Sequence, residues 1–190
     1  MSDNMPILHL EADFDIDQLG DRLEWRFKRS GARGEPLLAR YAGEIYLTRF
    51  EALDLRIRAG SAHPFKSFDV LDCCVISRPK IMRCVEGEKV EFALPSPFVY
   101  AAGSAVAGAT INLEAAKFKP AKVVQEPEYY LFAKKWDGVL MTGESLGRWD
   151  MSLVLTVRIN HADGRASVRV FECDPEAVVG ASALPQPPSP

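Results

Sequence analysis

The chain has 190 residues, of which 47% are hydrophobic and 26% are charged, and its formal net charge is -3. This length fits one substantial domain, the composition is that of an ordinary globular protein, and the lack of a basic excess argues against nucleic acid as a partner. Residues 1–4 are polar and show no signal-peptide pattern, and no run approaches 18 apolar residues. We therefore expect a cytoplasmic protein with no membrane partner.

Short period-two patterns predict strands in the first half of the chain. Apolar and polar residues alternate over 6–14, 19–27 and 53–59, although 19–27 also allows a short helix. The run 68–77 is almost continuously apolar, which is typical of an inner strand that is covered on both faces. A hairpin is expected over 81–94, because the turn Glu-Gly-Glu separates two apolar segments.

The second half of the chain contains the clearest strand signal. Residues 98–109 are rich in Ala, Gly and Ser and indicate a loop or a weak strand, whereas 111–118 and 129–136 predict strands. The apolar residues of the strongest strand occupy every second position: Met151, Leu153, Leu155, Val157 and Ile159. A turn at 161–164 and a returning strand at 166–173 complete a C-terminal hairpin at the centre of a sheet.

Together these elements predict an all-β fold. Many short strands without a long amphipathic helix favour a single-domain antiparallel β-sandwich, of jelly-roll or immunoglobulin-like type. We place this domain at residues 5–180. Residues 181–190 contain four prolines and are expected to form a disordered, proline-rich tail.

The cysteines and histidines give no support for a cofactor or a metal. Cys73, Cys74, Cys84 and Cys173 lack C-x-x-C spacing, and adjacent residues on a strand point to opposite faces. Buried, reduced thiols are preferred over a disulfide or a metal site. The three histidines are far apart in the sequence, so zinc ligation has no local support either.

One segment matches the G-x-S-x-G pattern of a serine nucleophile. Ser145 lies between Gly143 and Gly147, and the only downstream histidine is His161. The pattern requires a strained turn between a strand and a helix, but a period-two segment follows here. A loop bounded by glycines is therefore preferred, and a serine hydrolase is kept as a remote alternative.

Four acidic residues have the spacing of a calcium-binding loop. Asp13, Asp15, Asp17 and Glu24 occupy positions 1, 3, 5 and 12 of the pattern, but Gln18 stands where the sharp turn needs glycine. The flanking segments also predict strands instead of helices. Both interpretations remain open, a cation site and a solvated strand end, and the second is the plainer one.

Trp136 and Asp137 are candidates for a carbohydrate site. They stand where the strand 129–136 meets a turn, and an indole with a neighbouring carboxylate can stack on and hydrogen-bond to a sugar ring. Jelly-roll sandwiches commonly serve as lectins. A place for Trp136 in the core or its rim is preferred, and the carbohydrate site is kept as the alternative.

Several segments resemble one family of proteins. They are Asp15-Ile16-Asp17-Gln18-Leu19 after an apolar strand, the polar loop and short strand at 30–41, the strand pair 53–58 and 68–76, Pro95-Ser96-Pro97-Phe98, and the closing strand 168–179 with its Asp174-Pro175. In these the chain is similar to the AidA/PixA family of bacterial inclusion-body proteins. The resemblance implies a cytoplasmic β-sandwich that self-associates as a homo-oligomer, has no catalytic residues and is not an enzyme.

Overall fold

The computed structural model describes residues 7–30, 44–83, 91–92, 94–100, 108–124, 126–144, 146–174 and 176–179. They form two packed sheets and a small two-stranded ladder, so the expected all-β sandwich is confirmed. The expected tail at 181–190 and residue Ser145 lie outside the described residues. Within the described ranges, no helix has the length and hydropathy needed to cross a bilayer.

Sheet A, the seven-stranded sheet, has the order β10-β11-β4-β1-β2, and β12 pairs with both β4 and β8. Its strands are β1 (Ile7–Asp15), β2 (Glu24–Ser30), β4 (Ala52–Ser61), β8 (Phe98–Tyr100), β10 (Phe118–Ala121), β11 (Tyr130–Trp136) and β12 (Leu140–Thr142). A 3-10 turn, η1 (Ala115–Lys117), precedes β10.

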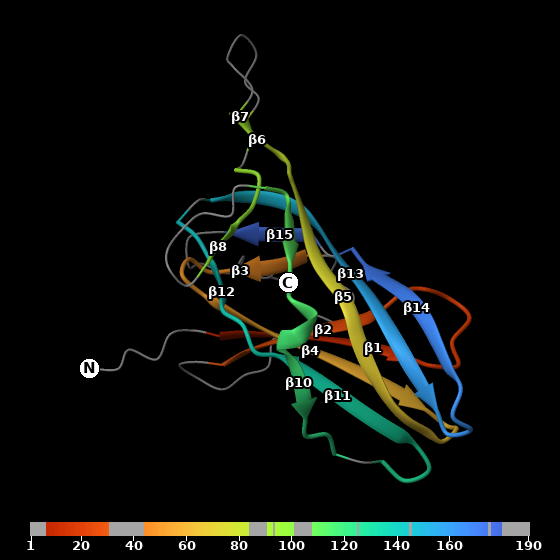
Figure 1. The fold of residues 1–190 in the computed structure, drawn as a ribbon. Helices are drawn as coiled ribbons and strands as arrows, with labels where there is room; N and C mark the ends of the chain where they lie inside the picture. The colour runs from red at the N-terminus through yellow and green to blue at the C-terminus, as the bar shows by residue number, and fades with distance from the viewer. Residues whose placement is uncertain are drawn as a thin grey trace, which may run out of the picture.

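Sheet B, the six-stranded sheet, has the order β3-β15-β13-β5-β9, with β14 also paired to β13. Its strands are β3 (Glu44–Leu47), β5 (Phe65–Pro79), β9 (Thr110–Asn112), β13 (Gly147–His161), β14 (Ala166–Cys173) and β15 (Glu176–Val179). Strands β6 (Ile81–Arg83) and β7 (Glu91–Phe92) pair in the hairpin expected at 81–94 and project from one end of the molecule (Figure 1).

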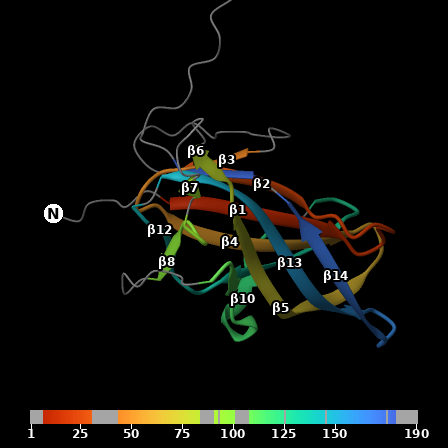
Figure 2. The same ribbon diagram turned by 90° about the horizontal axis from the view of Figure 1, so that it is seen from above.

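Most neighbouring strands are antiparallel, as expected, but two pairs are parallel. β1 runs parallel to β4, and β3 runs parallel to β15. The long strands of sheet A cross those of sheet B in both ribbon views (Figures 1 and 2). The parallel pairing of β1 with β4 places two strongly charged strands side by side in sheet A.

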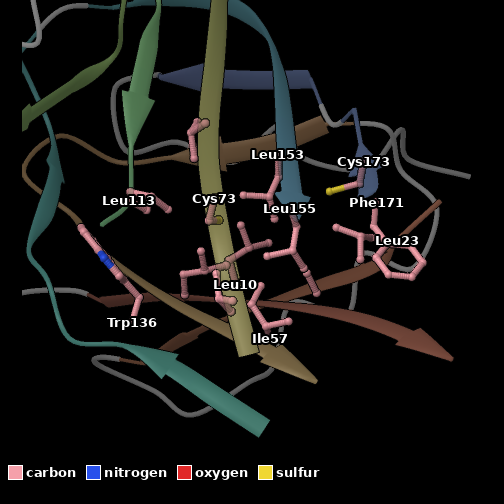
Figure 3. Packing of buried hydrophobic residues seen from close by; sticks show 14 of the residues in the cluster. Leu10, Leu23, Ile57, Cys73, Leu113, Trp136, Leu153, Leu155, Phe171 and Cys173 are labelled. Carbon is pink, nitrogen blue, oxygen red and sulfur yellow. The ribbon is translucent and has the colours of Figure 1, made fainter. Parts of the chain in front are cut away.

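The core lies between the inner faces of the two sheets. Alternate residues of β1, β4, β5 and β13 are buried there, and Figure 3 shows side chains from both sheets meeting. Phe14 of β1 stacks on Phe171 of β14 at a ring-centroid distance of 4.5 Å and meets Phe68 of β5 edge-on at 5.5 Å. These aromatic contacts join sheet A to sheet B.

The alternation predicted for the central strand is confirmed. In β13 every residue of the predicted inward set is buried, whereas Ser152 and Thr156 are half-buried and Arg158 is exposed. The turn after it contains Gly164 at φ 90°, a left-handed conformation that glycine adopts without steric cost. β13 lies between β5 on one side and β14 and β15 on the other, so it is the centre of sheet B.

The expectation that 68–77 is covered on both faces is wrong. β5 buries one face only, and Leu71, Asp72 and Cys74 reach the surface to different degrees. The register with β13 slips between Thr156 and Val157, and this bulge leaves two adjacent outward residues, Leu71 and Asp72. The apolar run therefore reflects a bulged strand whose outer side mixes apolar residues with Asp69 and Asp72, not double coverage.

Candidate functional site

The outer face of sheet A is lined by charged side chains on four adjacent strands. β1 presents His9, Glu11, Asp13 and Asp15 there, because the intervening residues are buried in the core. The parallel register sets Glu11 beside Arg56 and Asp13 beside Arg58 on β4, and the antiparallel register sets Glu11 beside Arg26 on β2. Opposite charges therefore meet along neighbouring strands.

Arg26 links the two acids of β1. Its Nε donates to Glu11 Oε2 at 2.8 Å, and its Nη2 donates to Asp13 Oδ2 at 2.6 Å. The two arginines of β4 lie farther off: Arg56 Nε is 3.5 Å and Arg58 Nη1 is 3.6 Å from Glu11 Oε1. Three guanidinium groups thus share the carboxylates of Glu11 and Asp13, and Glu24 lies beside Asp13 in the β1–β2 register.

Several polar atoms of this face are buried without a hydrogen-bond partner. They are Asp13 Oδ1, Asp54 Oδ1, Arg56 Nε and Arg58 Nε, although Arg58 Nε lies at an ion-pair distance of 3.6 Å from Asp13 Oδ1. A buried polar atom without a partner costs about 1–3 kcal/mol. Burial also raises the pKa of Asp13 to about 6, and it outweighs Arg58 and Arg26, which lower that pKa. The face is therefore less stable than a fully satisfied network would be.

Tyr129 forms one wall of the face. Its hydroxyl donates to Asp15 Oδ2 at 2.7 Å, and burial followed by this hydrogen bond raises the pKa of Tyr129. The ring lies directly on Gly60, where an added Cβ would come within 2.5 Å of the tyrosine ring carbon Cε1. Glycine at position 60 is therefore required for the close approach of Tyr129.

Two hollows open on this face, and Arg26 lines both of them. The acidic hollow has a volume of about 380 Å³ and is lined by two arginines, Arg26 and Arg58, and by four acids, Asp13, Asp15, Glu24 and Glu126. The basic hollow has a volume of about 490 Å³, and its charged lining comprises Arg26, Arg56, Lys122, Lys135, Glu11 and Asp54, together with His9. The two hollows therefore have opposite polarity.

The four acids of the calcium-like spacing are brought to one end of sheet A, but most have partners within the protein. Asp13 pairs with Arg26, Asp15 accepts from Tyr129, and Asp17 accepts from the Ser61 hydroxyl at 2.7 Å, which with His63 lowers the pKa of Asp17. Glu24 lies across from Asp13 in the β1–β2 register. Within the described ranges, no group of three or more His, Cys, Asp or Glu side chains is placed to hold a metal ion.

Trp136 lies in the core rather than on the surface. Its side chain is 7% exposed, its Nε1 is buried without a partner, and it lies among the packed side chains of Figure 3. An added Cβ at Gly138 would overlap the indole, which the loop thus covers closely. Asp137 is exposed, and its backbone N–H donates to Lys117 O at 2.8 Å. This conformation offers a sugar no free indole face.

His161 is far from the glycine-bounded segment that contains Ser145. Gly147 and His161 are the first and last residues of β13, so the strand separates them by roughly 45 Å at about 3.3 Å per residue. Two residues of chain between Gly147 and Ser145 span at most about 7 Å. His161, whose Nε2 lies 2.9 Å from Ser167 Oγ, is therefore at the opposite end of β13 from Gly147.

The outer face of sheet B is different, since it is partly apolar. Val168 and Val170 of β14 are 59% and 54% exposed, and Leu71 of β5 is 38% exposed. Val154 and Ile76 on the same side are half-buried. We call these five residues the apolar stripe. Charges of both signs border it, namely Arg158, Asp72 and Glu172, all exposed.

The charged face of sheet A was not predicted from the sequence. Arg56 and Arg58 visibly alternate with core residues, but nothing in the sequence places them beside β1, more than 40 residues earlier in the chain. A usable signal was present, because β1 and β4 carry opposite charges at matching alternate positions. Comparison of the chain with protein-family models, curated proteins and solved structures found no match.

Proposed function

We propose that the protein is a non-enzymatic β-sandwich that self-associates, and that copies meet through the apolar stripe of sheet B. The observation that carries this proposal is the exposure of Val168 and Val170 next to each other on the edge strand β14. Isolated apolar residues are common on protein surfaces, but two strongly exposed valines on one edge strand, with Val154, Leu71 and Ile76 on the same outer face, are typical of an interaction surface.

A second copy of this chain is the partner that fits the stripe. Arg158 of β13, Asp72 of β5 and Glu172 of β14 give the same surface both signs of charge, so two copies can pair opposite charges while their apolar side chains meet. The formal net charge of only -3 limits the repulsion between copies. Packing of valine against valine would remove the exposed apolar area from water.

Two further points support the proposal. The resemblance to the AidA/PixA inclusion-body family implies self-association without catalysis. The described cysteines, Cys73, Cys74 and Cys173, are free thiols, and burial raises the pKa of Cys173 to about 12. Unpaired thiols of low reactivity fit a reducing compartment, so we include a cytoplasmic location in the proposal.

Sedimentation equilibrium over a concentration series tests the proposal. The variant Val168→Lys with Val170→Lys places two positive charges on the stripe, and exposed lysines on an edge strand are compatible with the fold. The control is Val139→Lys, since Val139 is 50% exposed but follows β11 and lies outside sheet B. We expect wild-type and control to associate, and the double variant to associate at least about tenfold more weakly, equivalent to about 1.4 kcal/mol.

Two results would contradict the proposal. One is a wild-type protein that remains a 21.0 kDa monomer up to millimolar concentration. The other is association that the control variant weakens as much as the double variant does. The second result would mean that copies meet elsewhere.

A further inference from the structure

The basic hollow of sheet A has the dimensions of a small-molecule site. Its volume of about 490 Å³ lies within the range of about 300–1,000 Å³ that is usual for such sites. Strands β1, β2 and β4 form its floor, and Ala121 at the end of β10 and Lys122 after it form one side. Regular strands fix the positions of its charged groups, so little reorganisation is needed when a ligand enters.

Arg56 is a cation of this hollow whose guanidinium is only partly satisfied within the protein. Its Nη2 donates to the backbone oxygen of Lys122, which holds the guanidinium against the wall. Its Nε is buried, makes no hydrogen bond, and lies 3.5 Å from Glu11 Oε1, which is an ion-pair distance. The Arg56 side chain as a whole is 34% exposed and lines the hollow, so a ligand there can contact the accessible part of the guanidinium.

Lys135 supplies a second cation at the same place. It lies across from Arg56 in the β4–β11 register, and its Nζ is 2.9 Å from Asp54 Oδ2. The same carboxylate oxygen is 2.8 Å from His9 Nδ1. With Arg26 and Lys122 also in the lining, cations outnumber carboxylates by four to two. The hollow therefore favours a negatively charged ligand.

From these contacts we infer that the basic hollow binds the oxyanion group of a small ligand, a carboxylate or a phosphate, through Arg56 and Lys135. A guanidinium presents its N–H groups in a planar fork that matches two oxygen atoms of such a group. Lys135, on the neighbouring strand, adds a charge that can move toward the bound oxygens. This site is separate from the apolar stripe and does not depend on self-association.

The surroundings select a small ligand over a long polyanion. The acidic hollow on the same face contains four carboxylates, and Arg26 is the residue that the two hollows share. A nucleic acid lying across the face would place phosphates against Asp13, Asp15 and Glu24, which is repulsive. A compact ligand can remain within the basic hollow and avoid them.

Isothermal titration of the full chain with inorganic phosphate and, separately, with succinate tests the inference, at ionic strength held constant with sodium chloride. Arg56→Gln should raise the dissociation constant by at least about tenfold, and Lys135→Gln by about threefold. Arg165→Gln is the matched control, because Arg165 also pairs with a carboxylate, Asp163 at 2.6 Å, but in the exposed hairpin turn. The control should stay within about twofold of wild-type.

Every outcome either supports or overturns the inference. The inference is supported if either anion binds and its dissociation constant rises most in Arg56→Gln, less in Lys135→Gln and least in Arg165→Gln. The anion that binds shows whether the site takes a phosphate or a carboxylate. If Arg56→Gln does not fold, Lys135→Gln alone decides, because Lys135 is exposed and its loss leaves the core intact. The inference is overturned if neither anion produces more heat than sodium chloride, or if Lys135→Gln and Arg165→Gln behave alike.

Discussion

The two sheets differ in the residues on their outer faces, although both bury apolar residues on their inner faces. Both sheets bury every second residue, as in β1 and β13. Outside, β1 carries acids between arginines, whereas β14 carries Val168 and Val170. The period-two pattern therefore determines which side is the core, and the chemistry of the remaining positions determines what each sheet can bind.

The difference extends to side-chain type. On sheet A, long charged side chains and the segment after β10 line two hollows, whereas on sheet B the short β-branched side chains of Val168 and Val170 are exposed on β14. A hollow with an excess of cations suits a small charged ligand, and exposed apolar side chains suit another protein. Substitutions on the shared inner face and on the charged outer face can test this contrast.

The largest expected effect concerns the inner face. Leu155 is fully buried between β5 and β14, so Leu155→Ala should lower the free energy of unfolding by about 2–5 kcal/mol through lost burial and a residual cavity. Arg158→Ala, three residues later on the outer side, should cost under about 1 kcal/mol. Chemical denaturation of both variants measures the contrast, and equal costs would contradict the assignment of faces.

The next effect concerns Asp13 and pH. Its pKa is raised to about 6 in the folded state from 3.8, so the folded protein binds the proton more tightly than the unfolded chain. The stability that this provides is fully present below about pH 3.8 and is lost as the pH rises through about 6. At about 1.4 kcal/mol per pKa unit, the loss is at most about 3 kcal/mol.

Asp13→Asn removes this titration and provides the measurement. Urea denaturation at several pH values between 4 and 7.5 should show the wild-type protein losing stability relative to the variant as the pH rises. A difference between the two proteins that stays constant over this range would show that Asp13 titrates normally. Asp163→Asn is a suitable comparison, because its backbone and side-chain hydrogen bonds with Arg165 lower the pKa of Asp163.

A smaller effect is expected at the wall of the charged face. Gly60→Ala forces the new Cβ against the Tyr129 ring and should destabilise the protein by about 1–3 kcal/mol. Gly20→Ala meets nothing within 4 Å and should be neutral or slightly stabilising. In a Tyr129→Ala background the cost of Gly60→Ala should disappear, as thermal denaturation would show. A persisting cost would mean that the ring is not what excludes a side chain at position 60.

Much of the fold was predictable because it depends on local patterns. The strand at 151–159, its glycine turn and the returning strand are encoded within one continuous segment. The short strands β8, β12 and β15 were not identified as separate elements, since three or four residues give too little alternation to recognise. The bulge at Leu71 also has no local signal, because it depends on the register with β13.

The site was harder to predict because it depends on pairing between distant segments. Arg56 and Glu11 meet only because β1 and β4 are parallel neighbours, and sequence spacing does not reveal that pairing. The motifs that can be recognised within one short segment have structural roles instead. Trp136 contributes to the core, and Asp15 and Asp17 accept hydrogen bonds from Tyr129 and Ser61. Short motifs identify residue types, but the chemistry follows from what tertiary structure places beside them.

The separate roles of the two outer faces are tested most directly by measuring association and anion binding in the same two variants. If each outer face has its own role, Val168→Lys with Val170→Lys will reduce the sedimentation-equilibrium mass and leave the phosphate dissociation constant unchanged. Lys135→Gln will weaken phosphate binding and leave the mass unchanged. A variant that alters both properties, or a Lys135 variant that alters only the mass, would contradict the separation of the two faces.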